Sequence, residues 1–376
     1  MNALVDYAPA AHLALLAGVI ALLPLSWLWL RQRGADTRSR LAALTALTLF
    51  LTFDLVVFGS FTRLTDSGLG CPDWPGCYGH ASPLGASAAI AAAESALPGG
   101  PVSWNKAWIE MIHRYLAMTV GSLILVMAAV SWLERRRLPL SPWWPTLTLA
   151  WVIVQGLFGK YTVTLKLYPA VVSLHLLGGL MLLALLAVQH AAFGRRALTL
   201  APALRGGVAA VLAVLAVQVA LGGWVSSNYA VLACTGFPQC NGSWWPAADF
   251  RGGFTLLRAL GGGAEDGQPI TLESLVAIHL AHRLFALVAS VAVAGLAWRL
   301  GRETSAAARR CGLTLALLLL AQLASGLSNV VLGWPLVAAV AHSAGAAALV
   351  LTLTLLLARS RSRPLALRSR ATAAAA

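Results

Sequence analysis

The chain of 376 residues is 59% hydrophobic and only 11% charged, a composition that excludes an ordinary soluble domain. The net charge of +14 could point to nucleic acid, but the basic residues form no continuous stripe, so we expect no nucleic-acid partner. They gather instead in short clusters between apolar segments, as the topology determinants of membrane proteins do.

Apolar segments long enough to cross the ~30 Å hydrocarbon core as helices recur along the chain. They fall at about 11–30, 41–62, 107–132, 143–165, 170–193, 207–227, 273–298, 311–332 and 335–358. The pattern predicts an all-α polytopic protein that crosses the lipid bilayer about nine times.

Arginines cluster in every second connection between these segments and in the tail 361–376. Because positively charged connections stay on the cytoplasmic side, we expect these connections and the C-terminus in the cytoplasm. The two long loops, about 63–106 and 228–272, then lie in the periplasm of a bacterial-type inner membrane.

Each of these outer loops contains a pair of cysteines with five residues between them. The pairs are Cys71 with Cys77 and Cys234 with Cys240. An oxidising compartment favours one disulfide in each loop. A zinc site is the alternative, but this spacing and the lack of nearby histidine disfavour it.

The two halves of the chain form an internal repeat. Cys71 corresponds to Cys234 with an offset of 163, His113 to His282 with 169, and His175 to His342 with 167. Landmarks at a nearly constant offset indicate a duplication. Each unit holds an even number of spans, so the two bundles have the same orientation and form a parallel repeat.

The repeat divides the chain into four parts. Residues 1–40 form an extra N-terminal transmembrane helix with a cytoplasmic linker, and residues 361–376 form a basic tail. The four-helix units span residues 41–195 and 205–360.

Four histidines lie at similar depth within the first turns of spans that enter the membrane from outside. They pair as His113 with His175 and His282 with His342, one couple for each unit. An intramembrane histidine is costly and indicates a functional site. Two imidazoles on facing helices are how a helical bundle binds haem, with one axial ligand on each side of the iron.

A carboxyl group accompanies only the first of these couples. Glu110 precedes His113 by three residues, so the two would share a helix face. In the second unit His279 stands where Glu110 stood, and we interpret it as a residue that supports the ligand His282. Only the first unit therefore has a general acid or base in place, which makes Glu110 the candidate catalytic residue.

Other polar residues are candidates for supporting roles. Asp54 lies inside a span without an acidic counterpart in the other half, as a structural or proton-handling candidate. Basic residues near the outer helix ends are candidate contacts for haem propionates: Arg63, Arg114, Lys160 and Arg283.

Four stretches of the sequence closely resemble haem A synthases. They are residues 59–79, the motif Glu110-Met111-Ile112-His113-Arg114, residues 155–163 and residues 221–230. The likeness extends over about residues 45–358, and the extra segment at 11–30 departs from the eight-helix core of that family.

This resemblance implies an oxidoreductase that acts on a methyl group of haem O. The C8 methyl would become a formyl group through successive hydroxylations, giving haem A for haem-copper terminal oxidases. By the same resemblance, His282 and His342 hold a resident haem b, and His113 and His175 receive haem O with Glu110 at the reacting edge. The Cys71–Cys77 disulfide is expected to matter more for activity than the second one.

The expected partners are a haem O synthase as donor, the terminal oxidase during its assembly, and an electron acceptor for which quinone is a candidate. Whether the protein forms homo-oligomers stays open. Two other interpretations remain at this point: a two-haem cytochrome b-type protein that only transfers electrons, and a proton-coupled transporter.

Overall fold

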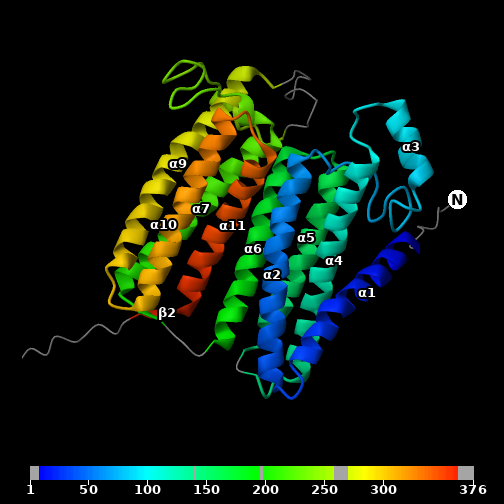
Figure 1. The fold of residues 1–376 in the computed structure, drawn as a ribbon, viewed down its shortest axis with the longest axis vertical. Helices are drawn as coiled ribbons and strands as arrows, with labels where there is room; N and C mark the ends of the chain where they lie inside the picture. The colour runs from blue at the N-terminus through cyan, green and yellow to red at the C-terminus, as the bar shows by residue number, and fades with distance from the viewer. Residues whose placement is uncertain (1–7, 139, 195–197, 258–269, 363–376) are drawn as a thin grey trace, which may run out of the picture.

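The computed structural model describes residues 8–138, 140–194, 198–257 and 270–362. Long helices that lie side by side dominate these ranges (Figure 1). They are α1 (Ala8–Arg31), α2 (Thr37–Leu64), α4 (Trp104–Leu133), α5 (Trp143–Thr164), α6 (Pro169–Phe193), α7 (Pro202–Ser227), α9 (Leu272–Gly301), α10 (Ala306–Val331) and α11 (Leu336–Arg359). The predicted all-α architecture is confirmed.

Eight helices of the described residues are long and apolar enough to cross a membrane, so the chain is a multi-pass membrane protein. The ninth long helix, α5, falls outside this set because its sequence includes Gln155, Lys160 and several threonines. Its 22 residues still suffice for a span of about 33 Å. It packs between α4 and α6, as a member of the same bundle.

The helices pack as two closed rings of four. In the first bundle, each of α2, α4, α5 and α6 contacts two of the others, in the ring order α2–α4–α5–α6. The second bundle repeats this ring with α7, α9, α10 and α11. The bundles meet where α6 contacts α7 and α11, while α1 packs against α4 and α2 at the outside of the first bundle (Figure 1).

Leucine, isoleucine and valine side chains fill the interior of both bundles. Leu123, Leu183 and Leu186 are fully buried in the first bundle, as are Leu300 and Leu315 in the second. These helices carry apolar residues on most of their faces, which a soluble protein would not expose but a bilayer accommodates.

The two helices that carry the His-Arg dipeptides begin in the same way. The Ser103 side chain accepts a hydrogen bond from Lys106 N at the start of α4. Thr271 does the same for Ser274 N at the start of α9. A side-chain cap satisfies an otherwise free N–H group of the first turn. The caps therefore set where each helix begins, about three turns before His113 in α4 and before His282 in α9.

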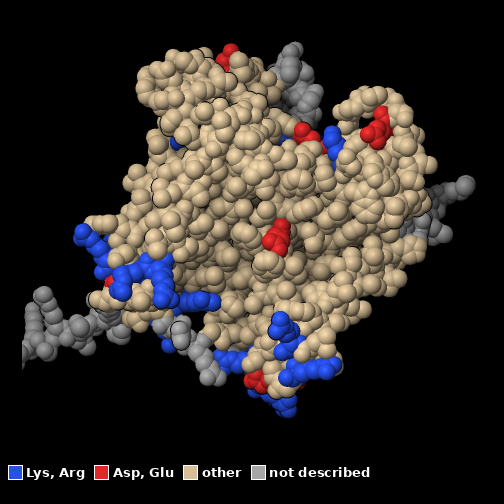
Figure 2. Space-filling model, in the orientation of Figure 1, with Lys and Arg blue, Asp and Glu red and all other residues tan. Residues whose placement is uncertain are grey.

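Both cysteine loops lie at the same end of the bundles (Figure 1), and most of the visible Lys and Arg residues lie at the other end (Figure 2). The first loop contains a helix that we did not expect, α3 (Ser87–Ala96). The second contains η1 (Ala230–Leu232) and α8 (Phe250–Gly253), and its residues 258–269 lie outside the described ranges.

A short parallel pairing joins the ends of the two bundles. Strand β1 (Leu198–Leu200) follows α6, and β2 (Ser360–Ser362) follows α11, with Leu198 opposite Ser360. The expected tail boundary at 361 therefore falls inside this pairing, and α2 begins at Thr37 rather than at 41. The rest of the tail, residues 363–376, lies outside the described ranges.

Candidate functional site

Each of the four predicted histidines lies against a glycine of a neighbouring helix. A Cβ atom added to Gly59 in α2 would stand 2.9 Å from Cε1 of His113 in α4. A Cβ atom added to Gly222 in α7 would stand 3.1 Å from Cε1 of His282 in α9. The corresponding distance is 3.6 Å from Gly159 to Cε1 of His175, and 3.1 Å from Gly326 to Cε1 of His342. A side chain at Gly59 would displace its imidazole, one at Gly222 or Gly326 would press on it, and one at Gly159 would make an ordinary contact.

The histidines come together as two couples, one in each bundle. His113 and His175 lie near enough for a charge on one ring to be felt by the other, and so do His282 and His342. The partners come from facing helices, α4 with α6 and α9 with α11. Phe58 stacks beside His113, with ring centroids 6.3 Å apart. The arrangement offers two imidazoles inside each ring of four helices.

These residues suit haem better than a bare metal ion. In the part of the chain that the structure describes, no three His, Cys, Asp or Glu side chains converge on one point. A porphyrin already surrounds its iron with four nitrogens, so two axial histidines are enough. The glycines beside the imidazoles let each ring lie directly against the neighbouring helix, inside the ring of four helices. His113 with His175 and His282 with His342 therefore fit haem.

The two couples differ in the hydrogen bonds of their rings. Gln218 Nε2 lies 3.1 Å from Nδ1 of His282, and Ser325 Oγ lies 3.0 Å from Nδ1 of His342. In the first bundle, Nδ1 of His113 and Nδ1 of His175 are buried without a partner among the described residues. The second bundle thus orients its imidazoles, whereas the first leaves them without polar support.

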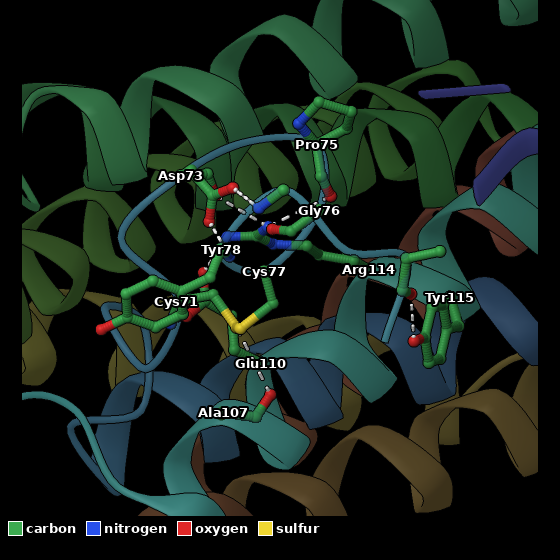
Figure 3. The surroundings of a disulfide bond; sticks show 12 residues. Cys71, Asp73, Pro75, Gly76, Cys77, Tyr78, Ala107, Glu110, Arg114 and Tyr115 are labelled. Carbon is green, nitrogen blue, oxygen red and sulfur yellow. Dashed lines mark hydrogen bonds and ion pairs between the residues drawn. A yellow bond between two sulfur atoms is a disulfide. The ribbon is translucent and has the colours of Figure 1, made fainter. Parts of the chain in front are cut away.

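Glu110 belongs to a buried network that fixes the first cysteine loop. It is 3% exposed, and its Oε2 accepts a hydrogen bond of 2.8 Å from Cys71 N. Its Oε1 forms an ion pair with Arg114, one turn further along α4. Arg114 also donates to the carbonyl groups of three loop residues, Asp73, Pro75 and Gly76 (Figure 3). Glu110 is therefore turned to the loop, whereas His113 is turned to α2.

The loop lies very close to the helix that holds it. A Cβ atom on Gly70 would overlap the backbone of Lys106 and Ala107 in α4. Cys71 Sγ lies 3.9 Å from the Ala107 carbonyl oxygen. Only glycine permits this approach, so the loop sits directly on the first turn of α4, above the histidine couple.

His279 and Arg283 repeat this network in the second bundle without a carboxylate. The His279 ring bonds the Ala230 carbonyl through Nδ1 at 3.0 Å, and its Nε2 accepts from Arg283 Nε at 3.1 Å. Arg283 donates to the carbonyl oxygens of Cys234 and Gln239. His279 thus acts with Arg283 to hold the second loop, and its ring nitrogens are both engaged.

Both expected disulfides are present in the structure. They join Cys71 to Cys77 and Cys234 to Cys240, with Cα atoms 4.9 Å apart in each. The cysteines are buried, and Figure 3 shows the first pair beside Glu110 and Arg114. The disulfide prediction is confirmed for both loops.

The candidate propionate contacts have protein partners in this structure. Arg114 and Arg283 bind their own loops, as described above, and Lys160 lies 5.9 Å from the ring centroid of Trp74. Arg63 forms an ion pair with Asp66 and donates to the Ser226 carbonyl at 2.6 Å, but its buried Nε has no partner among the described residues. Their contact with propionates stays a prediction.

Arg63 also takes part in a contact between the bundles. Its guanidinium lies 4.1 Å from the centroid of the Tyr229 ring, and the Tyr229 hydroxyl donates to Asp66 at 2.8 Å. Burial raises the pKa of this hydroxyl above its usual value of 10.0, so it keeps its proton at neutral pH. Asp54 lies apart from this contact, partly exposed in α2, without a hydrogen bond or ion pair in the described part of the chain.

Sequence reasoning missed several of these residues. Gln218, Ser325 and Tyr229 were not singled out, because one polar residue in an apolar helix or loop has no pattern of its own. The glycines at 59, 159, 222 and 326 were visible as repeat landmarks, but their contact with the histidines depends on how the helices are rotated. The recurrence of Gly with His in both halves was the available signal.

Comparison with known proteins shows the family to which the chain belongs. The family model described as cytochrome oxidase assembly protein (COX15-CtaA) matches residues 42–354. A haem A synthase of Shewanella oneidensis is 38% identical over 312 residues, which cover 82% of this chain and 92% of the relative. Haem A synthases of Cereibacter sphaeroides and Sphingopyxis alaskensis are 29% and 31% identical, covering 84% and 78% of this chain and 86% and 84% of the relatives. The chain therefore belongs to the COX15-CtaA family of cytochrome oxidase assembly proteins.

Proposed function

We propose that this protein is a haem A synthase, which oxidises the C8 methyl group of haem O to a formyl group. One observation carries the proposal: the two bundles repeat the same histidine couple, but only the first places a carboxyl group, Glu110, one turn away. Two identical haem sites would suffice for electron transfer alone. A difference between them is what an enzyme needs when one haem is a cofactor and the other is the substrate.

In this proposal the second bundle holds a resident haem b on His282 and His342. The first bundle receives haem O between His113 and His175. The glycines that face these imidazoles support both assignments, since each lets a ligand histidine lie close against the next helix. When bound, the haem iron supplies the redox chemistry that ordinary side chains lack.

Two successive hydroxylations of the methyl carbon, each taking its oxygen atom from water and releasing two electrons and two protons, would be followed by loss of water to give the formyl group. A membrane electron acceptor such as a quinone would take the electrons. Glu110 is the residue of this chain that would handle the proton. Its Oε2 faces the neutral N–H of Cys71, whereas its Oε1 faces the positive charge of Arg114. A proton released near the site is therefore better accepted at Oε2 than at Oε1.

The first loop would act as a cover for this site. Arg114 ties the loop carbonyls to α4, so the Cys71–Cys77 segment is held above His113. A rigid cover would separate the reacting edge of the substrate from bulk solvent, so that only a few water molecules reach it. The same clamp exists in the second bundle, where His279 replaces the acid.

The location that we propose is a bacterial-type inner membrane with both disulfide loops in the periplasm. The disulfides favour an oxidising compartment at that end, and the basic residues at the opposite end favour the cytoplasm (Figure 2). The substrate would come from an enzyme that forms haem O, and the product would pass to a terminal oxidase.

Co-expression with a source of haem O, in a bacterium that makes no haem A, tests the activity. Extracted haems are separated by chromatography and identified by mass. We expect formyl haem with the natural chain and none with His113→Ala. A preparation that carries haem b and haem O but never produces formyl haem would instead establish an electron-transfer cytochrome.

A further inference from the structure

We infer that Gln218 and Ser325 are positioning residues that make haem binding tight in the second bundle. The residues at the corresponding places of the first bundle, Leu55 and Phe158, leave haem binding loose enough for exchange. This inference rests on the proposed function, because it explains why one bundle would keep its haem while the other releases it.

Ser325 determines which nitrogen of the His342 ring carries the proton. Its hydroxyl donates to the Ala321 carbonyl at 2.7 Å, so its own hydrogen is already committed within α10. The contact of 3.0 Å with His342 Nδ1 must then be a bond in which Nδ1–H donates to Ser325 Oγ. The free lone pair of this imidazole is therefore on Nε2, the atom that a metal would bind.

Gln218 serves the other imidazole of the second bundle. Its side-chain nitrogen lies 3.1 Å from His282 Nδ1, 3.4 Å from Nε2 of the same ring and 3.3 Å from the His282 carbonyl oxygen. The nearer ring nitrogen is thus Nδ1, and the buried Oε1 of Gln218 has no partner in the described part of the chain. A half-turn of the terminal amide exchanges these two atoms, so the side chain can accept from Nδ1–H as well as donate to it. Each histidine of the second bundle thus has a polar residue at Nδ1.

The repeat shows what the first bundle has in these places. Gln218 lies four residues before Gly222, and Leu55 lies four residues before Gly59. Ser325 directly precedes Gly326, and Phe158 directly precedes Gly159. Since each of these glycines contacts the histidine of its own bundle, the positions correspond in space as well as in sequence.

The replacements remove every polar partner of the first couple. Leucine and phenylalanine offer neither donor nor acceptor. Nδ1 of His113 and Nδ1 of His175 are accordingly buried and unpartnered among the described residues. Their tautomer and ring orientation are not fixed by the protein, in contrast to His282 and His342.

Such hydrogen bonds have measurable consequences for metal ligands. A partner at the second ring nitrogen orients a histidine and raises its basicity, and its loss typically lowers metal affinity 10–100-fold. A resident cofactor gains from this support. A substrate that must enter as haem O and leave as haem A gains from its absence, because tight binding of product would stop turnover.

The test uses full-length protein from a host that makes only haem b. Two backgrounds keep one haem each: His113→Ala retains the second-bundle site, and His282→Ala retains the first-bundle site. The measurements are the rate at which haem b transfers to excess apomyoglobin and the midpoint potential of the bound haem. In the His113→Ala background, Gln218→Leu, Ser325→Ala and Ser325→Thr are each compared with the background protein. In the His282→Ala background, Leu55→Gln is compared with the background protein.

We expect Gln218→Leu and Ser325→Ala to release haem about 10-fold faster or more and to raise the midpoint potential, because a less basic ligand stabilises ferric iron less. Ser325→Thr keeps the hydroxyl and should match its parent. Leu55→Gln should slow release and lower the potential. Unchanged release and potential in both Gln218→Leu and Ser325→Ala would overturn the inference, as would faster release from Leu55→Gln.

The same samples separate this inference from the proposed function. A natural chain that binds no haem in either bundle would overturn both. If the natural chain makes formyl haem when it is co-expressed with a haem O source, while all the variants release haem b at the parent rate, only the assignment of Gln218 and Ser325 is overturned.

Discussion

Asp66 and Tyr229 hydrogen-bond to each other across the two bundles at 2.8 Å, and they are 163 residues apart. This is the offset that also relates Cys71 to Cys234, so two corresponding positions of the repeat meet in space. Arg63 and Ser226 meet in the same way and with the same separation. The symmetry axis of the duplication therefore passes through this contact, at the end of the bundles that carries the disulfide loops.

Arg63→Ala should loosen the contact between the bundles. The substitution removes the bond to the Ser226 carbonyl, the ion pair with Asp66 and the stacking on Tyr229. We expect a loss of about 1–3 kcal/mol in unfolding free energy, measured by thermal unfolding in detergent. Arg137→Ala is the matched control, since its ion pair with Glu134 is exposed and should contribute little. Equal midpoints for the two variants would contradict the role of Arg63.

Gly59→Ala should displace the imidazole of His113. The new methyl group would stand 2.9 Å from Cε1, which is closer than a Cβ contact normally comes. The expected result is loss of haem from the first bundle, measured as the molar ratio of extracted haem to protein. Gly121→Ala in α4 is the control, because a Cβ there meets nothing within 4 Å. If both variants retained the same haem content, the close contact between Gly59 and His113 would not be needed for haem binding.

Glu110→Gln should abolish formation of formyl haem while leaving haem bound. Glutamine keeps the size of the side chain and an acceptor for Cys71 N, but it cannot take up a proton in the same way. We expect activity to fall at least about 100-fold, the usual contribution of a general acid or base, by chromatography of extracted haems. His279→Gln, at the corresponding place of the second bundle, should have a much smaller effect on the reaction. Normal activity of Glu110→Gln would show that Glu110 has no role in proton transfer during the reaction.

The two disulfides should differ in importance. Replacing Cys71 and Cys77 by serine frees the loop segment whose backbone Glu110 and Arg114 hold. We expect a strong loss of formyl haem from this double variant. The same change at Cys234 and Cys240 affects the second loop, where His279 stands in the place of Glu110, and should lower stability more than activity. An equal loss of activity in the two double variants would show that the loops have equivalent roles.

The architecture and the histidine couples could be predicted from sequence because both depend on repeated patterns. Apolar segments of sufficient length specify membrane helices, and the repeat shows which histidines correspond. The paired cysteines needed only the side of the membrane on which they lie.

The partners of single polar residues could not be predicted in this way. The contacts of Arg114 with the first loop were not predicted, because the carbonyl groups that its guanidinium meets converge only after the loop has folded. The direction in which the Glu110 side chain points also depends on this loop, because its carboxylate accepts a hydrogen bond from Cys71 N. Helix α3 was missed because its alanine-rich sequence lies within a loop and has no amphipathic pattern. In each case the tertiary arrangement decided what the local sequence left open.

The central claim is that two sister bundles each hold a haem, and that only the first changes the haem it holds. The most direct measurement is the identity and amount of haem extracted from the purified natural chain, His113→Ala and His282→Ala after co-expression with a haem O source. We predict formyl haem only in the natural chain, haem b but no haem O in His113→Ala, and loss of haem b in His282→Ala. Formyl haem made by His113→Ala, or an unchanged content of haem b in His282→Ala, would contradict the account.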